Sequence, residues 1–300
     1  MDMTQNKCCR HGANLRRRRR RRRKILRSII FSCSIIAVAV FVAVGSRMIR
    51  SGDGRTNKYD VEAGNNTYDN AVIENSKISE KNKIQNNQSM LDDIMNSTQY
   101  PKQLKDLALK NEEALEFVYD YPAEHVKEHT IDLTEEASMD SVPLFVQWDK
   151  RWVYEKYSGN FFAASGCGPT TLSMVVVYLT HNRDASPIAV AKYSKEAGYS
   201  VDGSGSSWTL ISEGCRHYGV KAKTVALDES RMKAELDAGH PIVINVGPGD
   251  FTDTGHFMVI TGYDDEGFSI NDPNSIEKSG KRWLFKNISS QIRAVWSMYV

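Results

Sequence analysis

The sequence has few cysteines where a disulfide framework would need them. Five are present among 300 residues, and Cys8, Cys9 and Cys33 all precede residue 47. Only Cys167 and Cys215 lie farther along the chain, which excludes a disulfide-rich fold and allows at most one bridge. A cysteine retained in this part of the chain is therefore expected to be either buried or chemically active.

Negative charge is almost missing from the amino-terminal segment. Residues 1–28 contain twelve Lys and Arg but a single acid, and Arg16–Arg23 are eight consecutive arginines. Such a block cannot form a hydrophobic core, and it favours contact with the phosphates of lipid or nucleic acid. The whole chain carries a formal charge of +2, so the remainder is acidic at −9.

The apolar run that follows decides between these two partners. Residues 29–45 read IIFSCSIIAVAVFVAVG, seventeen residues without a charge. As a helix they would span roughly 25 Å, which suffices if flanking arginines reach the headgroups. We predict a transmembrane anchor at 29–46, a cytoplasmic basic tail at 1–28 and an extracellular remainder. A cleavable secretory signal ending at Ala43-Val44-Gly45 is the alternative, a twin-arginine signal is a weaker match, and nucleic-acid binding is not expected.

Large apolar residues are scarce between the anchor and residue 98. This composition predicts a disordered linker at 47–98. From Pro101 onward the apolar residues recur near a 3.6-residue period, which predicts a helical lead-in segment at 99–140 that packs on the following domain. His125 and His129 stand four residues apart, a spacing that can bind a metal on a helix. No third ligand is evident, so a solvated helix face is favoured.

Residues 141–300 predict one domain in which helices precede strands. Helix signals cover 169–179, 187–197, 208–218 and 229–238. Strand signals follow at 242–246, 257–263, 268–271 and 294–300. This order predicts an α+β fold with an antiparallel sheet, preceded by the single transmembrane helix.

The stretch SGCGPTTLSMV places Cys167 in a distinctive setting. Pro169 suits the first turn of a helix, so Cys167 should lie at the helix start, where free N–H groups and the helix dipole favour a thiolate. Gly166 and Gly168 would leave room for a substrate carbonyl. A small residue in a tight turn is the alternative. Cys215, by contrast, lies on an apolar helix face and is predicted to pack in the core.

A nucleophilic cysteine needs a base and a group that orients the base. His256 begins a strand in DTGHFMVITGYD, and Asp272 ends the next strand in FSINDPNS. Asp272 also suits an ordinary turn. Straight pairing from a tight turn would set Asp272 opposite Ile260, too far from His256, so a triad requires a bulge or a wider turn. Gln147 is a candidate oxyanion donor, together with the backbone N–H of Cys167, although a surface glutamine is the simpler interpretation.

Four motifs in order, VPLFVQWDKRW, SGCGPTTLSMV, GHFMVITGYD and INDPNS, resemble the bacteriocin-processing type of cysteine peptidase. The similarity covers about 142–300 and is greatest to the free-standing, secreted or membrane-anchored branch. It implies a papain-like fold, with Cys167 as nucleophile, His256 as base, Asp272 as orienting acid and Gln147 as oxyanion donor. Exporter-fused members cut after a Gly-Gly pair, whereas the expected outward-facing position leaves the cleavage preference open.

These observations predict a membrane-anchored extracellular cysteine peptidase that acts on a peptide or protein substrate. The expected chemistry requires no metal or organic cofactor. Two alternatives remain: a catalytically silent papain-like module that binds peptide or cell-wall ligands, and a transglutaminase-like acyl transferase that uses the same residues.

Overall fold

The computed structural model describes residues 66–300 apart from residue 153, with side chains described from residue 79 onward. Residues 70–300 form one unit. The predicted basic tail, the predicted anchor and residues 47–65 of the predicted linker lie outside the described residues. Within the described part, no helix combines the length and apolar character that crossing a membrane requires.

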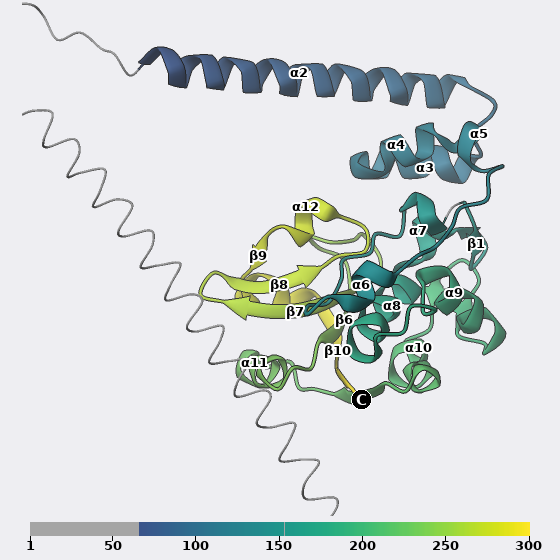
Figure 1. Cartoon of the computed structure of the whole chain (residues 1–300), viewed down its shortest axis with the longest axis vertical. Coiled ribbons are helices and arrows are strands. Elements are labelled where there is room, and N and C mark those ends of the chain that lie inside the picture. The colour runs from purple at the N-terminus through teal and green to yellow at the C-terminus, as the bar shows by residue number, and fades with distance from the viewer. Residues whose placement is uncertain (1–65, 153) are drawn as a thin grey trace, which may run out of the picture. The chain divides into compact units, whose positions relative to one another are not determined.

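Part of the predicted linker is helical. Helix α2 runs from Asn66 to Asn96 (Figure 1), so the prediction of disorder is wrong for these residues. Near its end Ile94 is fully buried, and Met90 and Leu91 pack beside it. The average composition of the segment is polar, but these few apolar residues recur on one helix face and bury it.

The lead-in segment is a series of short helices, as expected. It contains α3 (Lys102–Lys110), the 3-10 helix η1 (Glu112–Ala114), α4 (Leu115–Tyr119), α5 (Tyr121–Glu124) and α6 (Thr134–Ser138). Leu104, Leu107 and Phe117 bury their side chains in a cluster that also contains Tyr154 and Phe161 of the following domain. The prediction that this segment packs on the domain is therefore confirmed.

The helical half of the domain follows. It comprises η2 (Lys150–Trp152), the hairpin β1 (Lys156–Tyr157) and β2 (Asn160–Phe161), α7 (Phe162–Ser165), α8 (Cys167–Thr180), α9 (Pro187–Glu196) and the hairpin β3 (Ser200–Val201) and β4 (Gly205–Ser206). The helix predicted at 208–218 is interrupted. It divides into α10 (Thr209–Ser212) and the 3-10 helix η3 (Gly214–Tyr218), because Gly214 lies against the Tyr199 ring and the backbone leaves the α-conformation at Glu213.

The second half builds a six-stranded sheet in the order β5-β10-β6-β7-β8-β9, with every pair antiparallel. Its strands are β5 (Lys221–Thr224), β6 (Ile242–Val246), β7 (His256–Asp264), β8 (Gly267–Asn271), β9 (Arg282–Trp283) and β10 (Ile292–Tyr299). Strand β5 was not predicted, because KAKT is charged and lies at an edge, where lysine is typical. The connections hold α11 (Glu229–Asp237), α12 (Ile276–Ser279), α13 (Phe285–Ile288) and η4 (Ser289–Gln291).

Two hydrophobic clusters cover the two faces of this sheet. On one face α8 packs against β7, with Val175, Phe257 and Val259 in one cluster. On the other face Met232 of α11 and Ile288 of α13 pack with Met258 in a second cluster. Figure 1 shows α8, α9 and α10 gathered beside the sheet. The predicted α+β class with an antiparallel sheet is therefore confirmed.

Candidate active site

Cys167 is the first residue of α8, as the proline-based argument predicted. Gly166 is the N-cap, with no side chain to occupy the first N–H groups of the helix. The residue as a whole is partly exposed, although its sulfur lies among buried groups. Thr171 Oγ1, one turn later, donates to the backbone oxygen of Phe257 at 3.0 Å and ties α8 to the start of β7. The helix start and the strand start therefore meet at the sulfur.

The glycines that flank Cys167 have a different purpose from the one predicted. A Cβ at Gly166 would lie 2.6 Å from the Phe162 backbone oxygen, and a Cβ at Gly168 would lie 2.7 Å from Ser206 Cβ. The space on both sides is thus filled by the protein itself, and clearance for a substrate is not the reason for glycine here. The glycines let α7 and β4 approach the helix start closely.

His256 begins β7 and is buried, with 6% of its surface exposed. The β7–β8 ladder contains the irregularity that the triad requires, because the register shifts between Ile260 and Gly262. Before the shift Asp264 pairs with Gly267, and beyond it Val259 pairs with Asn271. Continued without a shift from the Asp264–Gly267 pair, the ladder would set Asp272 opposite Val259, one residue from the predicted Ile260 and on the other face from His256. The bulge moves it opposite Met258, onto the face of His256.

Asp272 reaches the imidazole directly. His256 Nε2 donates to Asp272 Oδ1 at 2.7 Å, and the carboxylate is fully buried. The same oxygen accepts the backbone N–H of Asn274 at 2.8 Å, so the turn interpretation of Asp272 is also correct. Because Nε2 is occupied by Asp272, Nδ1 is the ring nitrogen left to interact with Cys167.

Electrostatics couple these groups. Burial opposes the thiolate of Cys167, but the hydrogen bond and charge of His256, with the N–H groups of Phe257 and Gly168, lower the pKa of this thiol below its ordinary value. Burial likewise opposes the imidazolium, yet the charge and hydrogen bond of Asp272, helped by Cys167, raise the pKa of His256 to about 10. The arrangement therefore favours the charged form of both groups, a thiolate beside an imidazolium.

Gln147 lies near these residues and is buried, with 4% exposed. Its Nε2 donates to the Ala163 backbone oxygen at 2.7 Å, and its own backbone N–H donates to Pro273, next to Asp272, at 2.7 Å. Among the residues that the structure describes, neither its Oε1 nor Asp272 Oδ2 has a hydrogen-bond partner. The simpler interpretation of Gln147 as a surface residue is wrong, and its role as oxyanion donor stays a prediction.

Cys215 contrasts with Cys167. It is fully buried in the core as predicted, and burial raises the pKa of its thiol to about 11. The His125 and His129 rings contact Tyr121 and Glu124 of their own segment. Across the described residues, no group of three or more His, Cys, Asp or Glu is arranged to hold a metal.

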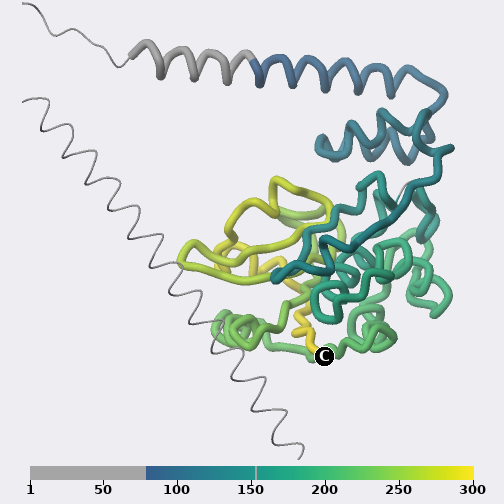
Figure 2. Tube along the Cα trace, in the orientation of Figure 1, coloured from purple at the N-terminus to yellow at the C-terminus, as the bar shows by residue number. Residues whose placement is uncertain are grey.

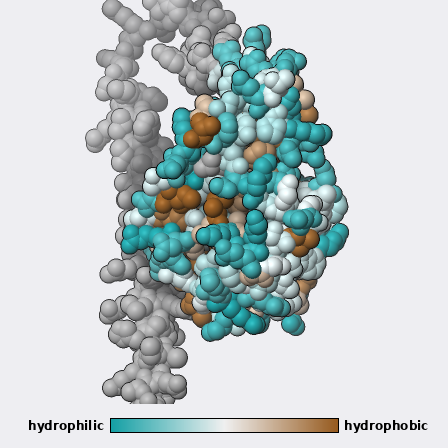
Figure 3. Space-filling model, turned by 90° about the vertical axis from the view of Figure 1, so that its right-hand side faces the viewer, coloured by the Kyte–Doolittle hydropathy of each residue, from teal (hydrophilic) through white to brown (hydrophobic). Residues whose placement is uncertain are grey.

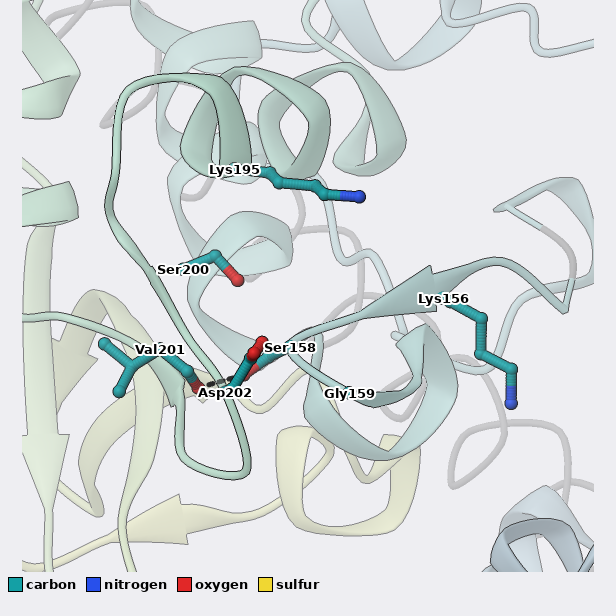
Figure 4. A pocket seen from close by; sticks show the side chains of 7 residues that line it. All are labelled: Lys156, Ser158, Gly159, Lys195, Ser200, Val201 and Asp202. Carbon is teal, nitrogen blue, oxygen red and sulfur yellow. Dashed lines mark hydrogen bonds between the residues drawn. The ribbon is translucent and has the colours of Figure 1, made fainter.

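A pocket of about 450 Å³ lies between the β1–β2 turn and the β3–β4 hairpin (Figure 4). Ser158 Oγ donates to the Val201 backbone oxygen within it, and Gly205 N donates to the same hydroxyl at 2.9 Å. None of the four predicted site residues lines this pocket; its lining is Lys156, Ser158, Gly159, Lys195, Ser200, Val201 and Asp202. Ser206 belongs to one of the two hairpins on either side of this pocket, and it packs against Gly168.

Residue patterns did not reveal the supports of Asp272. Its backbone N–H donates to Ser279 Oγ at 2.9 Å, and Ser279 Oγ in turn donates to the Ser275 backbone oxygen at 2.7 Å. The motif INDPNS ends before Ser279, and an ordinary serine in a short helix carries no sequence signal. Only the return of α12 beside β8 brings this hydroxyl to the acid.

This chain matches one family model and is similar to solved structures of peptidase domains. The model of the Peptidase_C39 like family matches residues 139–300. The peptidase domain of Streptococcus ComA, a bi-functional ABC transporter, is 18% identical, with 53% of this chain and 96% of that chain covered and a TM-score of 0.39. A putative C39-like peptidase from Bacillus anthracis is 17% identical, with 53% and 95% covered and a TM-score of 0.33. No curated protein matches significantly. Since the family model covers more than half of the chain, this protein belongs to the Peptidase_C39 like family of cysteine peptidases.

Proposed function

We propose that this protein is a membrane-anchored cysteine peptidase that hydrolyses amide bonds with a papain-like set of Cys167, His256 and Asp272. The observation that carries the proposal is the 2.7 Å bond between His256 Nε2 and the buried Asp272, which leaves the other ring nitrogen for the cysteine at the start of α8. A structural cysteine would not need a buried imidazole held by a buried carboxylate.

The proposed reaction follows from the protonation states. The Cys167 thiolate attacks the substrate carbonyl carbon, and imidazolium Nδ1 of His256 gives its proton to the leaving amine as the C–N bond breaks. A water molecule then gives a proton to Nδ1 while its oxygen attacks the thioester carbon, and breaking of the C–S bond releases the carboxylic acid and restores the Cys167 thiolate beside the imidazolium. Asp272 keeps the ring oriented and favours its charged form.

The oxyanion formed in each step requires donors. We assign this role to the backbone N–H of Cys167 and to the second N–H of Gln147 Nε2, since the first already donates to Ala163. Family membership and the proposed chemistry imply a peptide or protein substrate. The arginine block and apolar run at 16–45 support an anchor in the cell membrane, with the peptidase domain outside.

The activity proposal is tested by alkylating the full-length chain with iodoacetamide at pH 7 and measuring each cysteine by peptide mass spectrometry. Cys167 should react at least about 100-fold faster than Cys215, because thiolate rather than thiol is the nucleophile. His256→Ala should remove most of this difference. Equal rates for the two cysteines would contradict the proposal and favour a binding module without turnover.

The location is tested separately on intact cells that express the chain with a carboxy-terminal epitope. External protease should remove the epitope if the domain faces outward. Protection of the epitope in intact cells, with its loss after lysis, would reverse the proposed orientation and leave the chemistry untouched.

A further inference from the structure

Residues 99–138 of the lead-in segment precede the family-matched residues, and yet they touch the loop that carries Asp272. Asn111, between α3 and η1, donates through Nδ2 to the backbone oxygen and to Oδ1 of Asn274 at 2.9 and 3.0 Å. The indole of Trp148 donates to the same backbone oxygen at 3.2 Å. Figure 2 shows the two segments, far apart in sequence, passing near each other.

Glu113 makes the second attachment. Its Oε1 accepts the hydroxyl of Ser275, and its Oε2 accepts the backbone N–H groups of Ile276 and Glu277 at 2.8 and 3.1 Å. These are the first N–H groups of α12, which lack partners inside the helix. A single carboxylate thus uses both oxygens to hold the start of α12, and charged acceptors make the stronger hydrogen bonds.

Both attachments act on the turn that sets the position of Asp272. Asn274 accepts hydrogen bonds from Asn111, and its backbone N–H donates to Asp272 Oδ1. Ser279, at the end of the α12 turn that Glu113 holds, accepts the backbone N–H of Asp272. The oxygen that binds His256 is therefore set by a turn whose two ends are fixed from the lead-in segment.

We propose that Asn111 and Glu113 are positioning residues for the reaction, which hold the Asp272 turn so that its carboxylate meets His256. The inference rests on the proposed function. Apolar packing already attaches the lead-in segment to Tyr154 and Phe161. The polar contacts to residues 274–277 are additional to this packing, and they converge on the turn of the acid.

The test compares Glu113→Gln and Asn111→Asp with the wild-type full-length chain. Gln offers one acceptor oxygen for three donors. Asp at 111 keeps the oxygen that accepts the Glu113 N–H but loses the donor to Asn274. Glu112→Gln is the matched control, because Glu112 binds Asn87 and not the turn. The measurement is the rate of Cys167 alkylation by iodoacetamide from pH 5 to 9, with the thermal unfolding midpoint as a check of folding.

Both variants should shift the midpoint of the Cys167 pH–rate profile upward by about one unit, and the rate below the midpoint should fall roughly tenfold. Glu112→Gln should match wild type. If Glu113→Gln does not fold, Asn111→Asp decides alone. This inference is wrong if a folded variant keeps the wild-type pH–rate profile of Cys167 alkylation. The proposed function then still holds, provided that wild-type Cys167 reacts faster than Cys215. Failure of wild-type Cys167 to outpace Cys215 overturns both.

Discussion

Oδ1 of Asp272 accepts hydrogen bonds from two donors, the ring of His256 and the backbone of Asn274. The sequence offered two interpretations of Asp272, an acid that orients the histidine and an ordinary turn residue, and this one oxygen makes the contacts that both interpretations require. Because the turn fixes the carboxylate and burial removes water, the negative charge acts on His256 in a medium of low dielectric. The raised pKa of His256 follows from that placement.

A pH measurement separates the two partners of the ion pair. The folded pKa of His256 is raised from 6.5 to about 10, so its contribution to stability is present below pH 6.5 and is lost as pH rises toward 10. The lowered pKa of Cys167 acts in the opposite direction, since its contribution is present above the ordinary thiol pKa of 9.0 and is lost as pH falls. Where folded Cys167 is a thiolate, the proton that His256 gains on folding is balanced by the proton that Cys167 loses between about pH 6.5 and 9. The free energy of unfolding of the wild type should therefore not change with pH in this range through these two groups.

Cys167→Ser removes the compensating thiolate. Its free energy of unfolding should therefore fall relative to wild type by about 1 kcal/mol per pH unit above pH 6.5, until the remaining pKa of His256 is passed. Urea unfolding of both proteins at pH 6, 7 and 8 measures this difference. Parallel pH curves for the two proteins would show that no ion pair forms.

At the scale of elements, one extra residue in β7 decides the site. The register shift between Ile260 and Gly262 turns Asp272 to the face of His256. The sequence indicated that a bulge or wider turn was required but did not locate it. A glycine inside a strand often marks a bulge, so Gly262 was the available signal, although glycine alone does not say how the register changes. A bulge is stabilised by the packing of both sheet faces, and that packing involves residues far apart in the chain.

The start of α8 depends on close contact with β4. Gly168→Ala would press a Cβ against Ser206 and should destabilise the fold by about 1–3 kcal/mol. Gly262→Ala is a matched control, because its added Cβ would have no atom of the described residues within 4 Å apart from its own residue and chain neighbours. Denaturant unfolding of the two variants measures the contrast. Equal stability would mean that the helix start has room which the structure does not show.

At the scale of the whole molecule, residues before the matched family region complete the domain. Leu104, Leu107 and Phe117 share a cluster with Tyr154 and Phe161, and Ile94 of α2 closes it. The lead-in helices are therefore part of the fold as well as of the proposed support for Asp272. With regard to the surface, the face shown in Figure 3 is mostly hydrophilic, with hydrophobic residues in separate spots.

A chain that begins at residue 139 should expose Tyr154, Phe161 and Ala163, which this cluster buries. Burial of large apolar side chains is worth about 1.5–3 kcal/mol each, so the loss should be of the order of 5 kcal/mol. We expect a thermal midpoint lower by roughly 10–20 °C than that of a chain beginning at residue 86, which keeps the cluster. Equal midpoints for the two chains would show that the lead-in helices add nothing to domain stability.

The sequence by itself determined the helix start at Cys167, four of the six strands of the central sheet, the buried state of Cys215 and the order of Cys, His and Asp motifs. These depend on proline and glycine positions and on periodicity, which act over a few residues. Tertiary structure alone decided the bulge in β7, the helical end of α2, the purpose of Gly166 and Gly168, and the bonds from Asn111 and Glu113 to the Asp272 turn. The physical reason is that these features join residues up to 164 positions apart, where local preference carries no information and packing decides.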